Sequence, residues 1–151
     1  MKNNTFWRNV ATQGAVGYGQ APGTVATIMM IPLVFFMGSL QLNPTHYAML
    51  AAAFVIFGWY VAHCALPFFE EKDPSMIVID EMVSFIALFC FLPVTIKTII
   101  LGFIFFRIFD IFKPFGIAHF EELPGAAGIM LDDLAAALLA NFAIRFILYM
   151  L

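Results

Sequence analysis

Five acidic residues lie inside or at the ends of strongly apolar segments of this sequence. They are Asp80, Glu81, Asp110, Asp132 and Asp133. A carboxylate in or near the hydrocarbon of a membrane is costly, so it indicates a functional site by default. Carboxylate oxygens without a cysteine or histidine cluster favour a hard cation such as magnesium. The residue types therefore predict a carboxylate site for a hard cation such as Mg²⁺.

The first acidic pair follows a segment with the signals of a helix start. Asp73 is a good N-cap and Pro74 a good first helical residue, so a helix is predicted from about Ser75. On this helix Asp80 and Glu81 would point about 100° apart. They could bind one ion from two directions, or one could bind while the other holds a proton. The alternative is a pair of interfacial charges that reach water, although carboxylates are short for this.

A second group of charges recurs at intervals of three residues within a run of Phe and Ile. Arg107, Asp110 and Lys113 would form one stripe on a helix that stops at Lys113-Pro114. The functional interpretation gives Arg107 or Lys113 a phosphate to hold and Asp110 a metal. The alternative is a salt-bridge ladder that neutralises itself.

Two glycine-bearing segments precede predicted helices. Residues 125–128 lead into Asp132 and Asp133, and residues 17–23 lead into Thr24, a natural N-cap. Glycine lets backbone approach a ligand closely, and free N–H groups at a helix start favour anions. Both segments are therefore candidates for phosphate contact. The alternatives are a flexible connection before Thr24, and an aspartate pair that only complements the helix dipole.

The elements that position these residues are apolar segments of membrane-spanning length. The chain is 63% hydrophobic and 11% charged, whereas soluble domains are about 45–50% apolar and about 25% charged. Its mean hydropathy is +0.95. The apolar stretches cover about 24–42, 46–69, 75–92, 94–112 and 128–151. These features predict an all-α, polytopic integral membrane bundle with about five transmembrane or membrane-embedded helices.

Length and charge limit the organisation further. A chain of 151 residues suits a single domain over 1–151, with residues 1–23 as a cytoplasmic N-terminal segment. A net charge of −3 provides no basic patch, so no nucleic-acid partner is expected.

The distribution of charge predicts sidedness. With a cytoplasmic N-terminus, five of the seven cationic residues lie inside, and only Lys97 and Arg145 lie toward the outside. The same threading places all ten acidic residues inside. Glu70, Glu71, Glu121 and Glu122 are then expected to be solvated loop charges. The remaining carboxylates would form a cytoplasmic-side site at the depth of lipid headgroups.

Four linked motifs resemble the bacterial phosphatidylglycerophosphatase A family. In family order they are Pro22-Gly23-Thr24, Asp73-Pro74-Ser75 through Ile79-Asp80-Glu81, Phe106-Arg107 through Phe109-Asp110 with Lys113-Pro114, and Gly128-Ile129-Met130-Leu131-Asp132-Asp133. The chain departs from the family pattern only at small residues near these motifs, and the acidic positions are intact.

The resemblance implies a Mg²⁺-dependent, multi-pass phosphatase of the bacterial cytoplasmic (inner) membrane. It would convert phosphatidylglycerophosphate to phosphatidylglycerol and phosphate by metal-assisted hydrolysis. The five acidic residues named first would be catalytic and metal-binding. The phosphate or headgroup would contact Thr24, Asp73, Arg107 and Lys113. The number of metal ions, and the choice between attack by water and by an aspartate, stay open.

Two other classes of protein share intramembrane carboxylates. A small cation- or proton-coupled transporter is the main alternative, although transporters tend to place the site near the midplane. A non-catalytic membrane scaffold is the other.

Overall fold

The structure is a computed structural model that describes residues 5–71 and 74–150, and every regular element in these ranges is helical. In chain order the α-helices and 3-10 helices (η) are α1 (Thr5–Ala11), η1 (Val16–Tyr18), α2 (Pro22–Ser39), α3 (Pro44–Ala65), η2 (Leu66–Phe68), α4 (Ile79–Leu88), α5 (Ile96–Phe112), η3 (Pro114–Glu122) and α6 (Ala126–Met150). The predicted all-α class is confirmed.

Three stretches of helix are long and apolar enough to cross a membrane. They are Pro22–Ser39, Pro44–Phe68 and Ala126–Met150. The other two predicted membrane segments correspond to α4 and α5, which have only 10 and 17 residues. The chain therefore combines three candidate spans with two shorter apolar helices.

The helix that carries Asp80 starts later than predicted. The Ile77 N–H donates to the Pro74 carbonyl at 2.9 Å, and the Val78 N–H donates to Ala11 of α1 at 2.9 Å. These bonds hold residues 74–78 in a turn, and α4 begins at Ile79. The prediction of Pro74 as the first helical residue was wrong, and Asp73 lies outside the described residues. Asp80 consequently lies in the first turn of α4.

Two other helix starts differ from the expected ones. α2 begins at Pro22 after Ala21, which adopts a left-handed conformation (φ 48°, ψ 57°). Thr24 is therefore a residue of the first turn, and its prediction as the N-cap was wrong. Proline suits this first position because a backbone N–H there would have no hydrogen-bond acceptor within the helix, so its absence costs nothing. α6 begins at Ala126, two residues before the predicted start.

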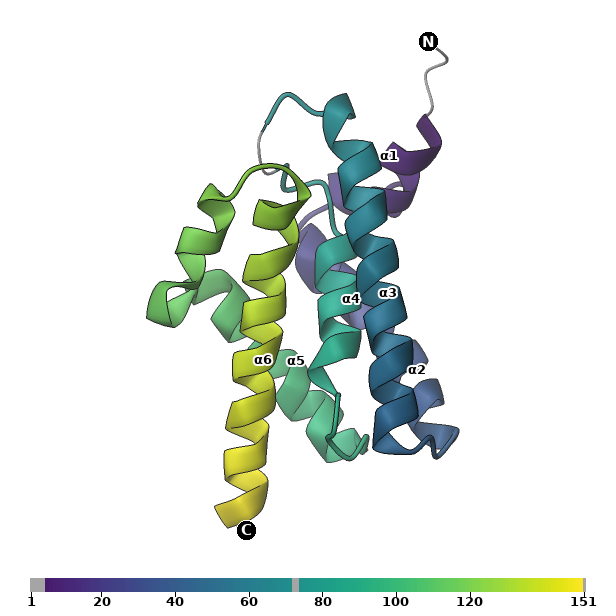
Figure 1. Ribbon diagram of the computed structural model, residues 1–151, viewed down its shortest axis with the longest axis vertical. Helices are drawn as coiled ribbons and strands as arrows, with labels where there is room; N and C mark the ends of the chain where they lie inside the picture. The colour runs from purple at the N-terminus through teal and green to yellow at the C-terminus, as the bar shows by residue number, and fades with distance from the viewer. Residues whose placement is uncertain (1–4, 72–73, 151) are drawn as a thin grey trace.

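The short helix α4 lies at the centre of the bundle, between α2, α3 and α6 (Figure 1). All of its residues except Glu81 and Ala87 are buried. Longer helices therefore shield α4 from lipid, and its acidic first turn lies inside the protein.

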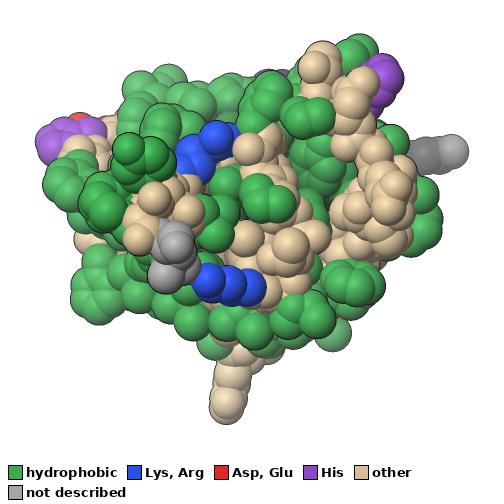
Figure 2. All heavy atoms as spheres, turned by 90° about the horizontal axis from the view of Figure 1, so that it is seen from below, with side chains coloured by type: hydrophobic (Ala, Val, Ile, Leu, Met, Phe, Trp, Pro, Cys, Tyr) green, Lys and Arg blue, Asp and Glu red, His purple; other side chains and the backbone are tan. Residues whose placement is uncertain are grey.

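The acidic cluster lies at one end of the bundle. The helices α2, α4 and α6 begin at this end, and α5 finishes there (Figure 1). The opposite end is covered mainly by hydrophobic side chains, with patches of Lys and Arg and almost no acidic groups (Figure 2). The predicted one-sided distribution of carboxylates agrees with this arrangement.

Candidate active site

A cavity of about 230 Å³ lies where the starts of α2, α4 and α6 meet the end of α5. It is lined by Pro22, Gly23, Pro74, Ser75, Ile77, Asp80, Glu81, Arg107, Asp110, Lys113, Asp132 and Asp133. The structure thus brings all five predicted carboxylates and both predicted cations to one cavity. Thr24 is not among the lining residues.

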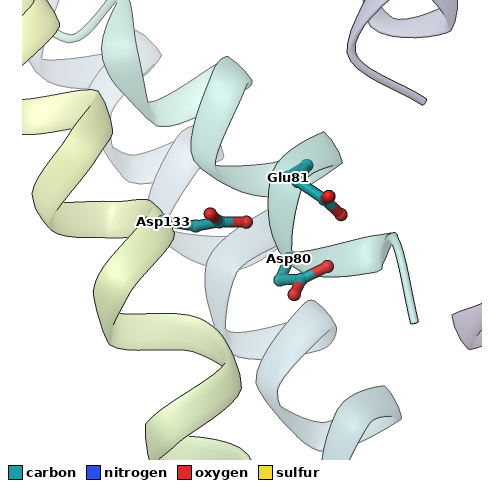
Figure 3. A group of neighbouring side chains, drawn as sticks. All are labelled: Asp80, Glu81 and Asp133. Carbon is teal, nitrogen blue, oxygen red and sulfur yellow. The ribbon is translucent and has the colours of Figure 1, made fainter. Parts of the chain in front are cut away.

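The carboxylates form two groups that share one residue. One oxygen each from Asp80, Glu81 and Asp133 lie within 4.8 Å of one another (Figure 3). Oxygens of Asp110, Asp132 and Asp133 form a second group within the same distance. Asp133 of α6 therefore belongs to both groups. It lies close to the carboxylates of α4 and also to Asp110 of α5.

Several of these oxygens lack a hydrogen-bond donor. Asp80 Oδ1, Glu81 Oε2 and Asp133 Oδ2 are buried without a hydrogen-bond partner among the described residues. Asp80 and Asp133 are only 7% and 3% exposed. Burying a charged group without compensation costs several kcal/mol in real proteins, on the order of the whole stability of a domain. Such an all-oxygen donor set fits a hard divalent cation, which would supply the missing compensation.

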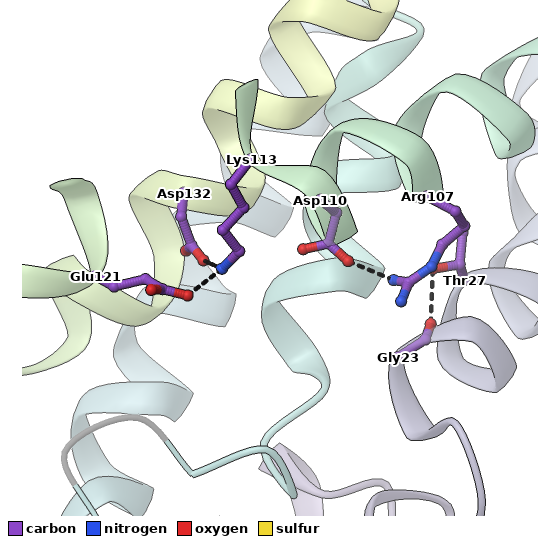
Figure 4. A network of polar contacts seen from close by, with 7 residues as sticks. All are labelled: Gly23, Thr27, Arg107, Asp110, Lys113, Glu121 and Asp132. Carbon is purple, nitrogen blue, oxygen red and sulfur yellow. Dashed lines mark hydrogen bonds and ion pairs between the residues drawn. The ribbon is translucent and has the colours of Figure 1, made fainter. Parts of the chain in front are cut away.

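Arg107 forms the predicted helical ion pair. Its Nη1 atom lies 2.8 Å from Asp110 Oδ2, one turn further along α5 (Figure 4). The same guanidinium lies beside the backbone of Gly23. A Cβ atom on Gly23 would be 3.1 Å from Arg107 Nη1 and would collide with Glu81 Oε1. Only glycine leaves room for these two charged side chains next to α2.

Lys113 does not continue the charged stripe. It ends α5 in a left-handed conformation (φ 44°, ψ 52°), and Phe115 and Gly116 also have positive φ. This reversal directs Lys113 toward α6, where its Nζ atom lies 2.6 Å from Asp132 Oδ2 (Figure 4). The ion pair that the ladder interpretation requires is therefore present between Arg107 and Asp110, but Lys113 does not extend it.

Lys113 is held in its charged form. Burial lowers the pKa of Lys113, but hydrogen bonds to Asp132 and Glu121 outweigh it and raise the pKa above its ordinary value. These hydrogen bonds therefore favour the protonated amine at the edge of the cavity.

The sequence interpretation missed Glu121. It was expected to be a solvated loop charge, but its carboxylate accepts a hydrogen bond from Lys113 (Figure 4). η3 folds back after the reversal at Phe115 and Gly116, which brings Glu121 to α5. No local signal in the sequence indicates this pairing, because it depends on the path of η3.

Comparisons with known proteins agree on one family. The sequence profile of the family described as Phosphatidylglycerophosphatase A matches residues 9–148. No solved structure matches the chain significantly.

Three curated relatives cover most of the chain. A Haemophilus influenzae protein named phosphatidylglycerophosphatase A is 34% identical over 142 residues, 89% of this chain and 86% of its own. An Escherichia coli protein of the same name is 29% identical over 140 residues, 88% and 80% of the two chains. A Bacteroides thetaiotaomicron protein, provisionally named phosphatidylinositol-3-phosphatase, is 36% identical over 123 residues, 77% and 76% of the two chains. The chain belongs to the phosphatidylglycerophosphatase A family.

Proposed function

We propose that this protein hydrolyses phosphatidylglycerophosphate to phosphatidylglycerol and inorganic phosphate, as a step of phospholipid biosynthesis. The convergence of five carboxylates and two cations on one small cavity carries the proposal. Two relatives are named for this reaction, and the third is named for another lipid phosphomonoester. A site at one end of the bundle also fits a lipid headgroup better than the midplane site of a transporter.

The carboxylates are the proposed ligands of magnesium. Asp80, Glu81 and Asp133 would hold one ion, and the second group would allow another beside it through the shared Asp133. A bound Mg²⁺ supplies neutralisation of the phosphate charge and activation of a water nucleophile. The buried oxygens without hydrogen-bond donors support this assignment.

The cationic side chains are the proposed phosphate contacts. Arg107 and Lys113 line the cavity from the end of α5, and each is already oriented by a carboxylate. Backbone N–H groups at the start of α2, α4 and α6 add partial positive charge on the same side. Thr24, in the first turn of α2, and Asp73 are the other proposed contacts of the phosphate or headgroup.

The hydrolysis needs two bond changes and two proton movements. A water oxygen forms a bond to phosphorus as the bond from phosphorus to the glycerol oxygen breaks. A cavity carboxylate takes one proton from the attacking water, and the resulting carboxylic acid gives a proton to the departing glycerol oxygen, so the carboxylate is restored and the phosphate keeps the other proton of the water. The base would be a carboxylate of the cavity with an oxygen that is not bound to the ion.

The proposed location is the bacterial inner membrane, with the site on the cytoplasmic side. Three candidate spans support a membrane position, and the excess of Lys and Arg that the sequence predicts on the cytoplasmic side supports the orientation.

The test is phosphate release from phosphatidylglycerophosphate by the detergent-purified protein. Activity should require Mg²⁺, and both EDTA and Asp133→Asn should reduce it at least ~100-fold, because a metal supplies several kcal/mol of charge stabilisation. Glu70→Gln is the matched control, since Glu70 is exposed and does not line the cavity. Full activity in EDTA or in Asp133→Asn would contradict the proposal. Phosphatidylinositol 3-phosphate, assayed in parallel, decides between the two named substrates.

A further inference from the structure

A second hollow runs between α2 and α5, outside the cavity. It has a volume of about 360 Å³. Apolar side chains line it, including Ile31, Pro32 and Phe35 of α2 and Ile96, Ile100 and Phe103 of α5. Several of them are strongly exposed, with Phe35 at 53% and Ile100 at 55%. We call this hollow the α2–α5 groove.

The groove is aligned with the cavity along α5. Arg107, which lines the cavity, is followed toward the start of the helix by Phe103, Ile100 and Ile96 at intervals of four, three and four residues. Side chains at this spacing share one face of a helix. One face of α5 therefore presents a guanidinium at the site end and apolar groups below it.

α2 provides the other wall in the same order. Thr24 lies in its first turn, and Ile31 and Phe35 follow at intervals of seven and four residues, again on one face. Because α2 begins and α5 ends at the cavity, the two helices run antiparallel past each other (Figure 1). Gly23 and Arg107 meet at the upper end of the pair.

The distance along α5 from Arg107 to the far end of the groove is close to half the thickness of the hydrocarbon core of a bilayer. At ~1.5 Å per residue, Phe103 lies about 6 Å and Ile96 about 16 Å below Arg107 along α5. Half of a hydrocarbon core of ~30 Å is about 15 Å. A molecule with its phosphate in the cavity would therefore have a hydrophobic chain at the depth of the groove.

We propose that the α2–α5 groove holds one acyl chain of the lipid phosphomonoester while the phosphate lies in the cavity. This inference rests on the proposed lipid phosphatase function. The substrate then enters sideways from its own leaflet, between α2 and α5. The other apolar hollows fit less well: one is formed by α3 residues alone, and another contains Arg145 near the opposite end.

The test compares two phosphatidylglycerophosphates that share a headgroup and differ in chain length. Ile100→Trp should lower kcat/KM for the dioleoyl substrate ~10-fold, because lost contact with about two methylenes suffices for this. The dibutyryl substrate in dilute solution should keep its kcat/KM within about twofold, because Ile100 lies about 10 Å from Arg107 along α5 and four-carbon chains end short of it. Ile56→Trp, on the lipid-exposed face of α3, is the matched control and should affect neither substrate. An equal loss for both substrates, or no loss for either, would overturn the groove assignment.

A second measurement does not depend on turnover. Phosphatidylglycerol with a photoactivatable diazirine midway along one acyl chain is cross-linked to the purified protein in vesicles. We expect labelled peptides to cover residues 31–35 and 96–103 more strongly than the exposed face of α3. Uniform labelling of all lipid-facing helices would contradict the proposal. A wild-type protein that releases no phosphate from either substrate would refute the proposed function, whereas the cross-linking pattern would still decide the groove.

Discussion

The charged groups that line the cavity do not balance within the described part of the chain. Five carboxylates face Arg107 and Lys113, and both cations already have acidic partners. Like charges held close together destabilise the folded state, and proteins commonly accept such a cost at functional sites. The imbalance is therefore the expected state of a site that binds a divalent cation.

Gly23 shows how tightly these charges are packed. In Gly23→Ala the new methyl group would push Glu81 away from its oxygen cluster and crowd Arg107. We expect phosphatase activity to fall ~10-fold or more, because even a 1 Å displacement of a catalytic group costs as much as ~100-fold. Thermal stability should change little, because the higher helix propensity of alanine, ~1 kcal/mol over glycine, offsets the cost of crowding Glu81 and Arg107. Phosphate release and melting temperature measure the two effects separately.

Gly19→Ala is the control for this substitution. Gly19 has a negative φ (−85°) and lies in the same segment, but the nearest atom to an added Cβ is the Val16 carbonyl oxygen, not a cavity group. An inactive Gly19→Ala, or an active Gly23→Ala, would argue against contact between Gly23 and the site.

At the scale of elements, hydrogen bonds from neighbouring helices fix where α4 begins and where it ends. Its start follows the Val78–Ala11 hydrogen bond to α1. Beyond its end, Asn141 Nδ2 of α6 donates to the carbonyls of Leu88 at 2.6 Å and Cys90 at 3.0 Å. Backbone carbonyls within a membrane protein need such partners because no water is available there. The cap thus allows a helix of ten residues to end inside the bundle.

Removal of this cap should destabilise the protein. Asn141→Leu keeps a side chain of similar size but leaves the Leu88 carbonyl without its amide donor, whereas the Cys90 carbonyl keeps its hydrogen bond from Arg145 Nη2 at 3.2 Å. We expect the free energy of unfolding to fall by ~1–3 kcal/mol. Unfolding in mixed micelles measures this change. Leu138→Ala, on the exposed face of α6, is the control, and an equal effect of the two substitutions would refute the capping role.

At the scale of the whole molecule, the carboxylates of the cavity lie at one end of the bundle. The opposite end shows mainly apolar side chains and almost no acidic groups (Figure 2). At the cavity end, carboxylates of α4, α5 and α6 lie close together and repel one another. A bound cation would offset this repulsion and so stabilise this part of the fold most.

Magnesium without substrate should therefore stabilise the protein. A ligand at 100 times its Kd adds ~2.7 kcal/mol to the folded state. At about 2–4 °C per kcal/mol, the melting temperature should rise by several degrees. Asp133→Asn should raise the melting temperature of the metal-free protein, because it removes repulsion, and should reduce the rise with Mg²⁺. NaCl at equal ionic strength is the control, and an equal rise with NaCl would contradict specific binding.

Much of this organisation could be predicted from the sequence. The apolar lengths predicted helices at the positions of α2, α3, α5 and α6, because burial in a membrane requires continuous apolar helices. The five carboxylates were predicted as one site, because charge within apolar segments is costly and seldom retained without function. The resemblance of four motifs predicted the family, which the comparisons confirmed.

Only the tertiary structure decided how the site is assembled. The start of α4 at Ile79 depends on a hydrogen bond to α1, and the pairing of Lys113 with Glu121 depends on the reversal at Phe115 and Gly116. The sharing of Asp133 between two oxygen groups depends on the packing of α6 against α4 and α5. A local residue pattern indicates that a charge is buried at a cost. The charged and hydrogen-bonding groups that offset this cost come from helices distant in the sequence, so only the tertiary structure identifies them.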